Sequence, residues 1–300
     1  PTRVSRGHGD GRQGAFHVRV PTDRSSGRVQ SHKRAFMRIA VFTSNQPRHL
    51  ALIRDLSEVA DEVFAVQECN TVFPGKINDF FPKSAVMQEY FSRVMAAEAR
   101  IFGRIEFLPA NVRTMSIKAG DLNLLGIETF AEALQSDFFV VFGASFIKGP
   151  LAERLISSGA VNIHMGVSPY FRGSSCNFWA LHDGHAKLVG ATIHKLSKGL
   201  DSGPVLFHAL PAARPYDPFD LGMVAVNAAH MGLVSAIRRG DLLTMPALEQ
   251  DKTREIRYSR ADAFTDEVAR QYLAHLPTPD QIGDRLAKRD PKMLFNPFFA

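Results

Sequence analysis

The sequence predicts an α/β domain built on a mostly parallel sheet and followed by a smaller C-terminal extension. Short, continuously apolar runs alternate with longer segments of helical periodicity along the chain. Such runs are typical of parallel strands that helices cover on both faces. Among the 300 residues 45% are hydrophobic, which is enough to form a sizeable core.

The individual elements follow from the same two periodicities. We expect strands over residues 38–43, 62–67, 138–143, 160–164, 188–195 and 204–209. We expect helices over residues 47–59, 84–102, 129–136, 149–158, 176–183 and 218–239. Proline, glycine and asparagine predict a long loop over 70–83, and the region after the last helix is expected to end in a polar tail.

The composition of residues 1–36 differs from that of the rest of the chain. This stretch is rich in Arg, Gly and Ser, and its eight Lys/Arg against two Asp/Glu account for the whole formal charge of +6. We expect a disordered leader, with a transit peptide or a nucleic-acid-binding tail as the alternatives, and whether Met37 is the true start stays open. Because basic and acidic residues are equal in number beyond residue 36, bulk charge does not imply a phosphate-binding surface.

Other sequence features exclude several classes of protein. The two cysteines, Cys69 and Cys176, form neither a disulfide framework nor a CxxC metal pair, so we expect a cytoplasmic protein without a metal site. No unbroken apolar run reaches the roughly 18 residues that a bilayer requires, so no membrane partner is expected. No glycine-rich phosphate loop follows a strand, which argues against nucleotide binding of that kind.

Three polar side chains in the region 159–208 are candidates for chemistry. Within the expected strand 160–164, Asn162 and His164 share one face because strand side chains alternate. They lie near the carboxyl end of that strand, where open α/β sheets place their ligand crevices. Farther along, a turn bracketed by glycines holds Asp201.

An amide, an imidazole and a carboxylate suit the transfer of an activated acyl group to an amine. The amide and the imidazole can bind the oxygen that becomes negative as the tetrahedral intermediate forms. The carboxylate can keep the imidazole protonated and accept, through water, the proton that the amine loses. The same trio also fits ordinary hydrogen-bonded residues at a sheet end, and spacing alone leaves both interpretations open.

Several short motifs occur in the order and at the separations of one known family. They are VNIH at 161–164, YFRG at 170–173, NFWAL at 177–181, GATIH at 190–194 and GLDSG at 199–203. On these motifs the chain resembles the formyltransferase superfamily, closely over 137–208 and in outline over 37–210. That superfamily includes glycinamide ribonucleotide transformylases, methionyl-tRNA formyltransferases and sugar N-formyltransferases. The chain departs from the family pattern at Met165-Gly166, where Pro-Ser is common.

The resemblance implies a Rossmann-like formyltransferase catalytic domain over 37–210, with a twisted sheet, and a helical C-terminal extension over 211–300. It implies a folate-dependent enzyme of one-carbon metabolism whose formyl-donor cosubstrate is 10-formyltetrahydrofolate. It also implies that Asn162, His164 and Asp201 are the catalytic residues. The residues that it implies for folate binding are Phe142, Gly143, Ala144, Ser145, Phe146, Gly166, Val167, Ser168, Pro169 and Leu200.

The acceptor is less well indicated than the donor. Segments 44–50 and 256–272 are similar to sugar N-formyltransferases, which implies an amino sugar on a nucleotide carrier, and Arg48 or Arg172 could bind its diphosphate. Methionyl-tRNA is the alternative, although residues 211–300 carry 12 basic and 12 acidic residues and no basic cluster for tRNA.

Four further points stay open. Water as the acceptor would make the protein a 10-formyltetrahydrofolate hydrolase. A folate-binding module without catalysis would be expected to lack the His or the Asp, and both are present. The oligomeric state is open, a homodimer included. His194 can serve either as a structural residue or as a proton relay.

Overall fold

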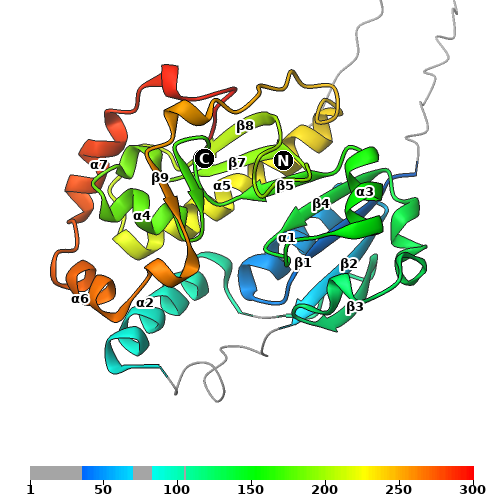
Figure 1. Cartoon of the computed structure of the whole chain (residues 1–300), viewed down its shortest axis with the longest axis horizontal. Helices are drawn as coiled ribbons and strands as arrows, with labels where there is room; N and C mark the ends of the chain where they lie inside the picture. Colours follow the sequence, from blue (N-terminus) through cyan, green and yellow to red (C-terminus); the bar gives the residue numbers. More distant parts are fainter. Residues whose placement is uncertain (1–35, 70–82, 105) are drawn as a thin grey trace, which may run out of the picture. The chain divides into compact units, whose positions relative to one another are not determined.

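The computed structural model describes residues 36–69, 83–104 and 106–300. Its main feature is a mostly parallel sheet covered by helices, as the sequence predicts (Figure 1). The predicted leader up to residue 35 and the predicted loop over 70–82 lie outside the described residues.

The described residues form an eight-stranded sheet in the order β10-β8-β7-β5-β4-β1-β2-β3. Neighbouring strands are parallel except for the pairs β5–β7 and β7–β8. The strands of this sheet are β1 (Arg38–Ser44), β2 (Glu62–Cys69), β3 (Val112–Lys118), β4 (Phe138–Phe142), β5 (Val161–His164), β7 (Ala191–Lys195), β8 (Val205–Leu210) and β10 (Phe298–Phe299). A separate parallel pair joins β6 (Phe171–Gly173) to β9 (Arg257–Ser259).

The helices agree with the sequence prediction in most places. They are α1 (Pro47–Ser57), α2 (Ala85–Phe102), α3 (Gly149–Ser157), α4 (Cys176–His182), α5 (Pro218–Arg239), α6 (Asp266–Ala274) and α7 (Pro279–Ala287). The prediction of an α-helix over 129–136 is wrong. Two short 3-10 segments, Ile127–Phe130 and Ala133–Gln135, occupy that region. Helices α6 and α7 lie within 211–300, where the sequence analysis expected a helical extension but placed no helix after residue 239.

Strand β1 shows why continuous apolar runs build this sheet. Its side chains alternate between two cores: Ile39 and Val41 belong to one buried cluster, and Ala40 and Phe42 belong to another. The first cluster includes residues of α1 and α5, and the second includes residues of α3. Since both faces are covered, the strand must be apolar at every position.

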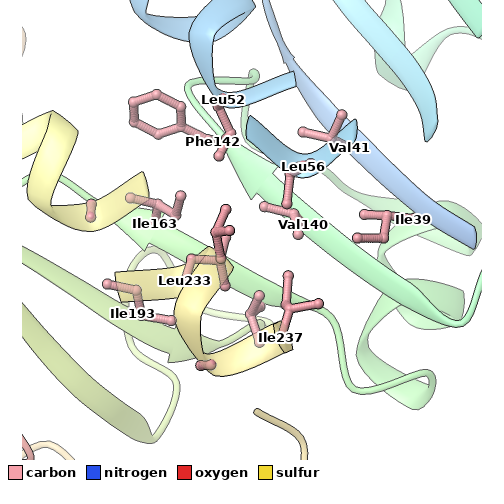
Figure 2. Close-up of a cluster of buried hydrophobic side chains, with 14 of the residues drawn as sticks. Ile39, Val41, Leu52, Leu56, Val140, Phe142, Ile163, Ile193, Leu233 and Ile237 are labelled. Atoms are coloured by element: carbon pink, nitrogen blue, oxygen red, sulfur yellow. The ribbon is translucent and has the colours of Figure 1, made fainter. Parts of the chain in front are cut away.

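Helix α5 packs into the same core as the strands that carry the candidate site. Figure 2 shows Leu233 and Ile237 of α5 beside Ile163 of β5 and Ile193 of β7. The helix begins at Asp217, whose carboxylate accepts hydrogen bonds from two backbone N–H groups of the first turn. It ends at Gly240, which has a left-handed backbone conformation.

Among the helices of the described residues, α5 is the one long and apolar enough by length and composition to cross a membrane. Most of its apolar window is buried inside the protein, which is equally typical of a core helix. The predicted domain boundary at residue 210 stays a prediction. Helix α5 follows that position in the chain and shares a core with β5 and β7, and β10 pairs with β8.

We predict that α5 behaves as a core helix when single side chains are shortened. Leu233 is fully buried, whereas Met231 is 49% exposed. Leu233→Ala should lower the free energy of unfolding by about 2–5 kcal/mol, because it removes buried methyl groups and leaves a cavity. Met231→Ala, the matched control, should change it by no more than about 0.5 kcal/mol. Urea denaturation measures both, and equal losses would contradict the core placement.

Candidate active site

The three candidate catalytic residues meet at one edge of the sheet. Strand β5 carries Asn162 and His164, and the turn between β7 and β8 carries Asp201. The Nδ1 atom of His164 lies 3.2 Å from Oδ2 of Asp201, and Nδ2 of Asn162 donates to Oδ1 of Asp201 at 3.1 Å. The structure therefore brings together all three residues that the sequence singled out.

His164 and Asp201 form a buried, charged pair at neutral pH. Burial by itself lowers the pKa of His164, but the hydrogen bonds and charges of Asp201 and Cys176 outweigh it and raise this pKa to about 10. Burial by itself raises the pKa of Asp201, but the hydrogen bond and the positive charge of His164 outweigh it and hold this pKa well below its usual range. Both shifts describe an imidazolium that is paired with a carboxylate.

His194 orients the Asn162 side chain. Its Nδ1 lies 2.9 Å from the backbone oxygen of Lys195, which can only accept, so the ring proton is on Nδ1. Its Nε2 then accepts a hydrogen bond from Nδ2 of Asn162 at 3.0 Å. This arrangement favours the structural role for His194 over the proton relay.

The hydrogen bonds of Asn162 limit what its amide can do. The amide nitrogen already donates to Asp201 and to His194. Donation to a developing oxyanion, which the sequence analysis expected, therefore requires that one of these bonds be exchanged. No hydrogen bond from a described residue reaches the amide oxygen, so this oxygen is able to accept from a substrate N–H.

The turn that carries Asp201 has an unusual backbone. Asp201 has a left-handed conformation with φ of 46°, which Asp tolerates better than most residues with a side chain. Two residues later, a Cβ atom on Gly203 would lie 1.8 Å from the backbone oxygen of Lys195. A glycine is thus required at 203 so that the turn can pack against the end of β7.

A first cavity of about 270 Å³ opens beside the catalytic trio. Six of the residues expected to bind folate line it, namely Phe142, Gly143, Ala144, Ser145, Phe146 and Leu200. Phe146 and Leu200 are 44% and 49% exposed, so both offer apolar surface to a ligand in this cavity. An apolar wall with a few backbone polar groups suits a flat heterocyclic ligand.

The other four residues expected to bind folate do not line this cavity. Val167 and Ser168 are fully buried, and Val167 belongs to the core cluster that contains Phe171 and Trp179. The backbone of Ser168 is held by Thr192 and His208. Gly166 is buried next to Cys176, and Pro169 follows Ser168 in the same interior loop. Their role in folate binding stays a prediction.

Glu68 is a residue that the sequence analysis missed. It lies near the end of β2 and is 3% exposed. Its carboxylate accepts hydrogen bonds from the backbone N–H groups of Ser145 and Gly120. It therefore ties the loop at the first cavity to the neighbouring strands. A single Glu at a strand end carries no sequence signal for this function, since it depends on two loops that are distant in the chain.

A second cavity of about 380 Å³ reaches His164 from another direction. His164 and Met165 line both cavities. The other residues around the second cavity are Arg48, Tyr90, Phe91, Val94, Gly173, Ser175, Cys176, Asn177, Phe178, Gly222, Met223, Val226 and Phe264. Because His164 forms part of both walls, ligands in the two cavities would meet at its imidazole ring.

Aromatic rings and one cation give the second cavity its chemical character. The ring of Tyr90 lies 5.8 Å from that of Phe178 and 4.8 Å from that of Phe264, centroid to centroid. Nη1 of Arg48 forms an ion pair of 2.8 Å with the buried Glu98. These residues come from distant parts of the chain, so sequence periodicity could not bring them together.

Two further observations concern reactive groups. Sγ of Cys176 lies 3.6 Å from Nε2 of His164, a contact that no sequence motif indicates. Within residues 36–69, 83–104 and 106–300, no group of three or more His, Cys, Asp or Glu side chains is placed to hold a metal ion.

We predict that Asp201→Asn lowers the pKa of His164 below its ordinary value of 6.5. The substitution removes the charge that offsets burial, and burial alone favours the neutral ring. NMR titration of histidine-labelled protein measures this pKa.

In the wild type, the raised pKa of His164 stabilises the fold fully below pH 6.5, and this contribution is lost as the pH rises through about 10. The lowered pKa of Asp201 contributes stability above its ordinary value of 3.8, which is lost on further acidification.

The wild type should therefore exceed Asp201→Asn in stability most clearly between about pH 4 and 6.5, where both contributions are present. Asp241→Asn is the control, because Asp241 forms an ion pair of 2.8 Å with Arg239 after the end of α5 and lines neither cavity. It should leave the His164 titration unchanged. A His164 midpoint that stays near 10 in Asp201→Asn would refute the ion pair.

Comparison with known sequences gives an independent assignment. The family model described as "Formyl transferase" matches residues 37–237. A methionyl-tRNA formyltransferase of a Synechococcus species is 31% identical over 130 residues, 41% of this chain and 38% of that protein. The methionyl-tRNA formyltransferase of Aromatoleum aromaticum is 32% identical over 163 residues, half of each chain. The chain thus spans half or less of the length of these curated relatives.

Solved structures of two other formyltransferases align with most of the chain. A sugar N-formyltransferase from a Shewanella species aligns with a TM-score of 0.45 and 16% identity over 88% of this chain and 92% of that one. A glycinamide ribonucleotide transformylase from Symbiobacterium toebii aligns with a TM-score of 0.46 and 19% identity over 76% and 100%.

The family match covers more than half of the chain and contains Asn162, His164 and Asp201. It confirms the resemblance on which the sequence analysis rests. The chain belongs to the formyl transferase family.

Proposed function

We propose that the protein is an enzyme that transfers a formyl group from 10-formyltetrahydrofolate to the primary amine of an amino sugar carried on a nucleotide. The observation that carries this proposal is the position of His164. Its imidazole, held protonated by Asp201, lies in the walls of two separate cavities. A formyl donor in one cavity and an amine in the other would meet at a positively charged hydrogen-bond donor.

The first cavity has the properties expected of the donor site. Phe142, Phe146 and Leu200 offer apolar surface to a pterin ring, and the backbone of 143–145 offers polar groups to its edge. A cavity of about 270 Å³ holds the ring system while the rest of the folate lies outside. When bound, the donor would supply the formyl carbon: the bond from that carbon to the amine nitrogen forms, its bond to N10 breaks, and N10 takes up a proton to balance the one that the amine loses.

The catalytic roles follow from the hydrogen bonds of the site. Nε2 of the His164 imidazolium, which donates to the backbone oxygen of Phe171 here, can donate instead to the formyl oxygen and so stabilise the negative charge that develops there. Asp201 keeps His164 protonated and can accept, through water, the proton that leaves the amine. The free amide oxygen of Asn162 can accept from an amine N–H and orient the nitrogen for attack.

The second cavity supports an amino-sugar nucleotide as the acceptor. The rings of Tyr90, Phe178 and Phe264 offer flat surfaces to a nucleobase, and Arg48 offers a cation to its diphosphate. Arg172, the other cation considered from the sequence, lines neither of the two cavities, whereas Arg48 lines the second. We therefore assign the diphosphate contact to Arg48.

Two free cysteines suit a cytoplasmic location for such an enzyme.

Methionyl-tRNA is the second candidate acceptor. Curated relatives of that name are 31% and 32% identical to the matched segments. Against it, the basic and acidic residues of 211–300 are equal in number, whereas tRNA binding needs a cluster of basic residues. A hydrolase would use water instead of an amine, and water needs no cavity lined with aromatic rings.

We predict that His164→Ala and Asp201→Ala abolish formyl transfer while folate binding persists. Each substitution removes a contribution to the transition state worth roughly 10²-fold or more in rate. His275→Ala, on the exposed end of α6, is the control and should have wild-type activity. The assay supplies 10-formyltetrahydrofolate with amino-sugar nucleotides, formylatable tRNA or water alone. Near wild-type turnover by either site variant would eliminate the proposed mechanism.

We predict that the acceptor KM changes by less than about tenfold between 50 and 200 mM salt, because a diphosphate makes few ionic contacts. A tRNA acceptor with six or more phosphate contacts would lose roughly 10³-fold or more in affinity over this range. Initial rates at varied acceptor concentration measure this dependence. A steep salt slope with tRNA as the formylated product would promote the second candidate.

A further inference from the structure

The turn that carries Asp201 is held by a side chain from beyond the region that matches the family. Nε2 of Gln250 donates to the backbone oxygens of Asp201 and Gly203, at 2.9 and 2.8 Å. One planar amide therefore binds two carbonyls that lie two residues apart in the chain. This contact sets the spacing between the two carbonyls, and with it the direction in which the Asp201 side chain leaves the turn.

The backbone of this turn has few other hydrogen bonds to side chains, which come from Arg172 and Ser197. Gly199 and Gly203 flank it, and glycine loses more backbone freedom on folding than any other residue. The left-handed backbone of Asp201 is itself a sparsely populated conformation. Within the turn, the hydroxyl of Ser197 binds the backbone oxygen of Gly199 and the hydroxyl of Ser202. A contact from outside the turn is therefore well placed to select the productive conformation.

Gln250 belongs to a longer segment, 248–259, that attaches to the protein on both sides of the catalytic pair. On the turn side, Leu248 and Val205 exchange two backbone hydrogen bonds of 2.8 Å. Glu255 forms an ion pair of 3.1 Å with Arg172, whose guanidinium also donates to the backbone oxygen of Leu200 at 3.5 Å. These contacts fix the segment next to the residue that precedes Asp201.

On the His164 side, the segment pairs with the strand that contacts the imidazole. Strand β9, which ends the segment, pairs with β6. The first residue of β6, Phe171, accepts a hydrogen bond from Nε2 of His164 through its backbone oxygen at 3.3 Å. The same segment thus touches the backbone beside each member of the ion pair, and it couples their positions.

We infer that Gln250 is a positioning residue for Asp201 in the proposed formyl transfer, and this inference rests on that proposed function. Gln250 does not line either cavity and does not touch the catalytic imidazole. It acts through the turn, by keeping the Asp201 carboxylate within hydrogen-bonding distance of His164.

The test compares Gln250→Ala and Gln250→Glu with Gln281→Ala in the full chain. The first variant removes the amide, and the second keeps its size but replaces both N–H donors with acceptors. Gln281 forms a capping box with Thr278 at the start of α7, so its removal weakens a helix without touching the turn. Thermal unfolding of all three variants shows whether a lost activity reflects only lost stability.

The kinetic readout is the separation of kcat from KM. A misplaced carboxylate impairs the transition state, so kcat should fall by about 10- to 100-fold in both Gln250 variants. The KM for 10-formyltetrahydrofolate should change by less than about threefold, because the donor cavity is intact. Gln281→Ala should keep wild-type values of both constants. A Gln250→Glu variant with wild-type kcat would overturn the inference, since it cannot donate.

The second readout does not need activity. The titratable groups that contact His164 are Asp201 at Nδ1 and Cys176 at Nε2, and Arg48 lines the same second cavity. If Asp201 moves, the NMR titration midpoint of His164 should fall by about one pH unit in Gln250→Ala and not in Gln281→Ala. An unchanged midpoint in Gln250→Ala would overturn the positioning role. If the His164 midpoint falls in Gln250→Ala but the wild-type protein formylates no acceptor, the positioning role of Gln250 stands and the proposed function is refuted.

Discussion

The rest of the site depends on the ion pair between His164 and Asp201. Two charges inside a protein lose their hydration, and their mutual attraction compensates only when further hydrogen bonds satisfy the remaining polar atoms. Here Asn162 donates to the second oxygen of Asp201, and the backbone oxygen of Phe171 accepts from His164. Around the pair, His194 orients Asn162 and Gln250 holds the turn. The neighbouring residues are thus arranged to keep one imidazole charged.

The sheet places this pair where two ligands can approach it. Strand β5 is parallel to β4 on one side and antiparallel to β7 on the other, so the sheet changes direction at the strand that carries His164. The loop that follows β4 forms one wall of the first cavity, and Met165, which follows β5, lines both cavities. Family members commonly have Pro-Ser where this chain has Met165-Gly166, so this departure falls between the proposed donor and acceptor.

Sequence reasoning predicted the parts of this arrangement that depend on local pattern. The strand that holds Asn162 and His164 was predicted because apolar residues alternate with them along a short run, and the turn at Asp201 because two glycines bracket it. Strand β3 was missed because it is an edge strand whose side chains are largely exposed. The aromatic wall made by Tyr90, Phe178 and Phe264 was missed because only tertiary packing brings these rings together.

The central claim is that donor and acceptor occupy different cavities and meet at His164. A crystal structure of the protein with 5-formyltetrahydrofolate, a donor analogue, and an amino-sugar nucleotide tests it directly. We expect the pterin between Phe142 and Leu200, the N10 atom facing the imidazole of His164, and the sugar amine in the cavity that Tyr90 and Phe178 line. Density for the folate in that second cavity, or for N10 turned away from His164, would contradict the account.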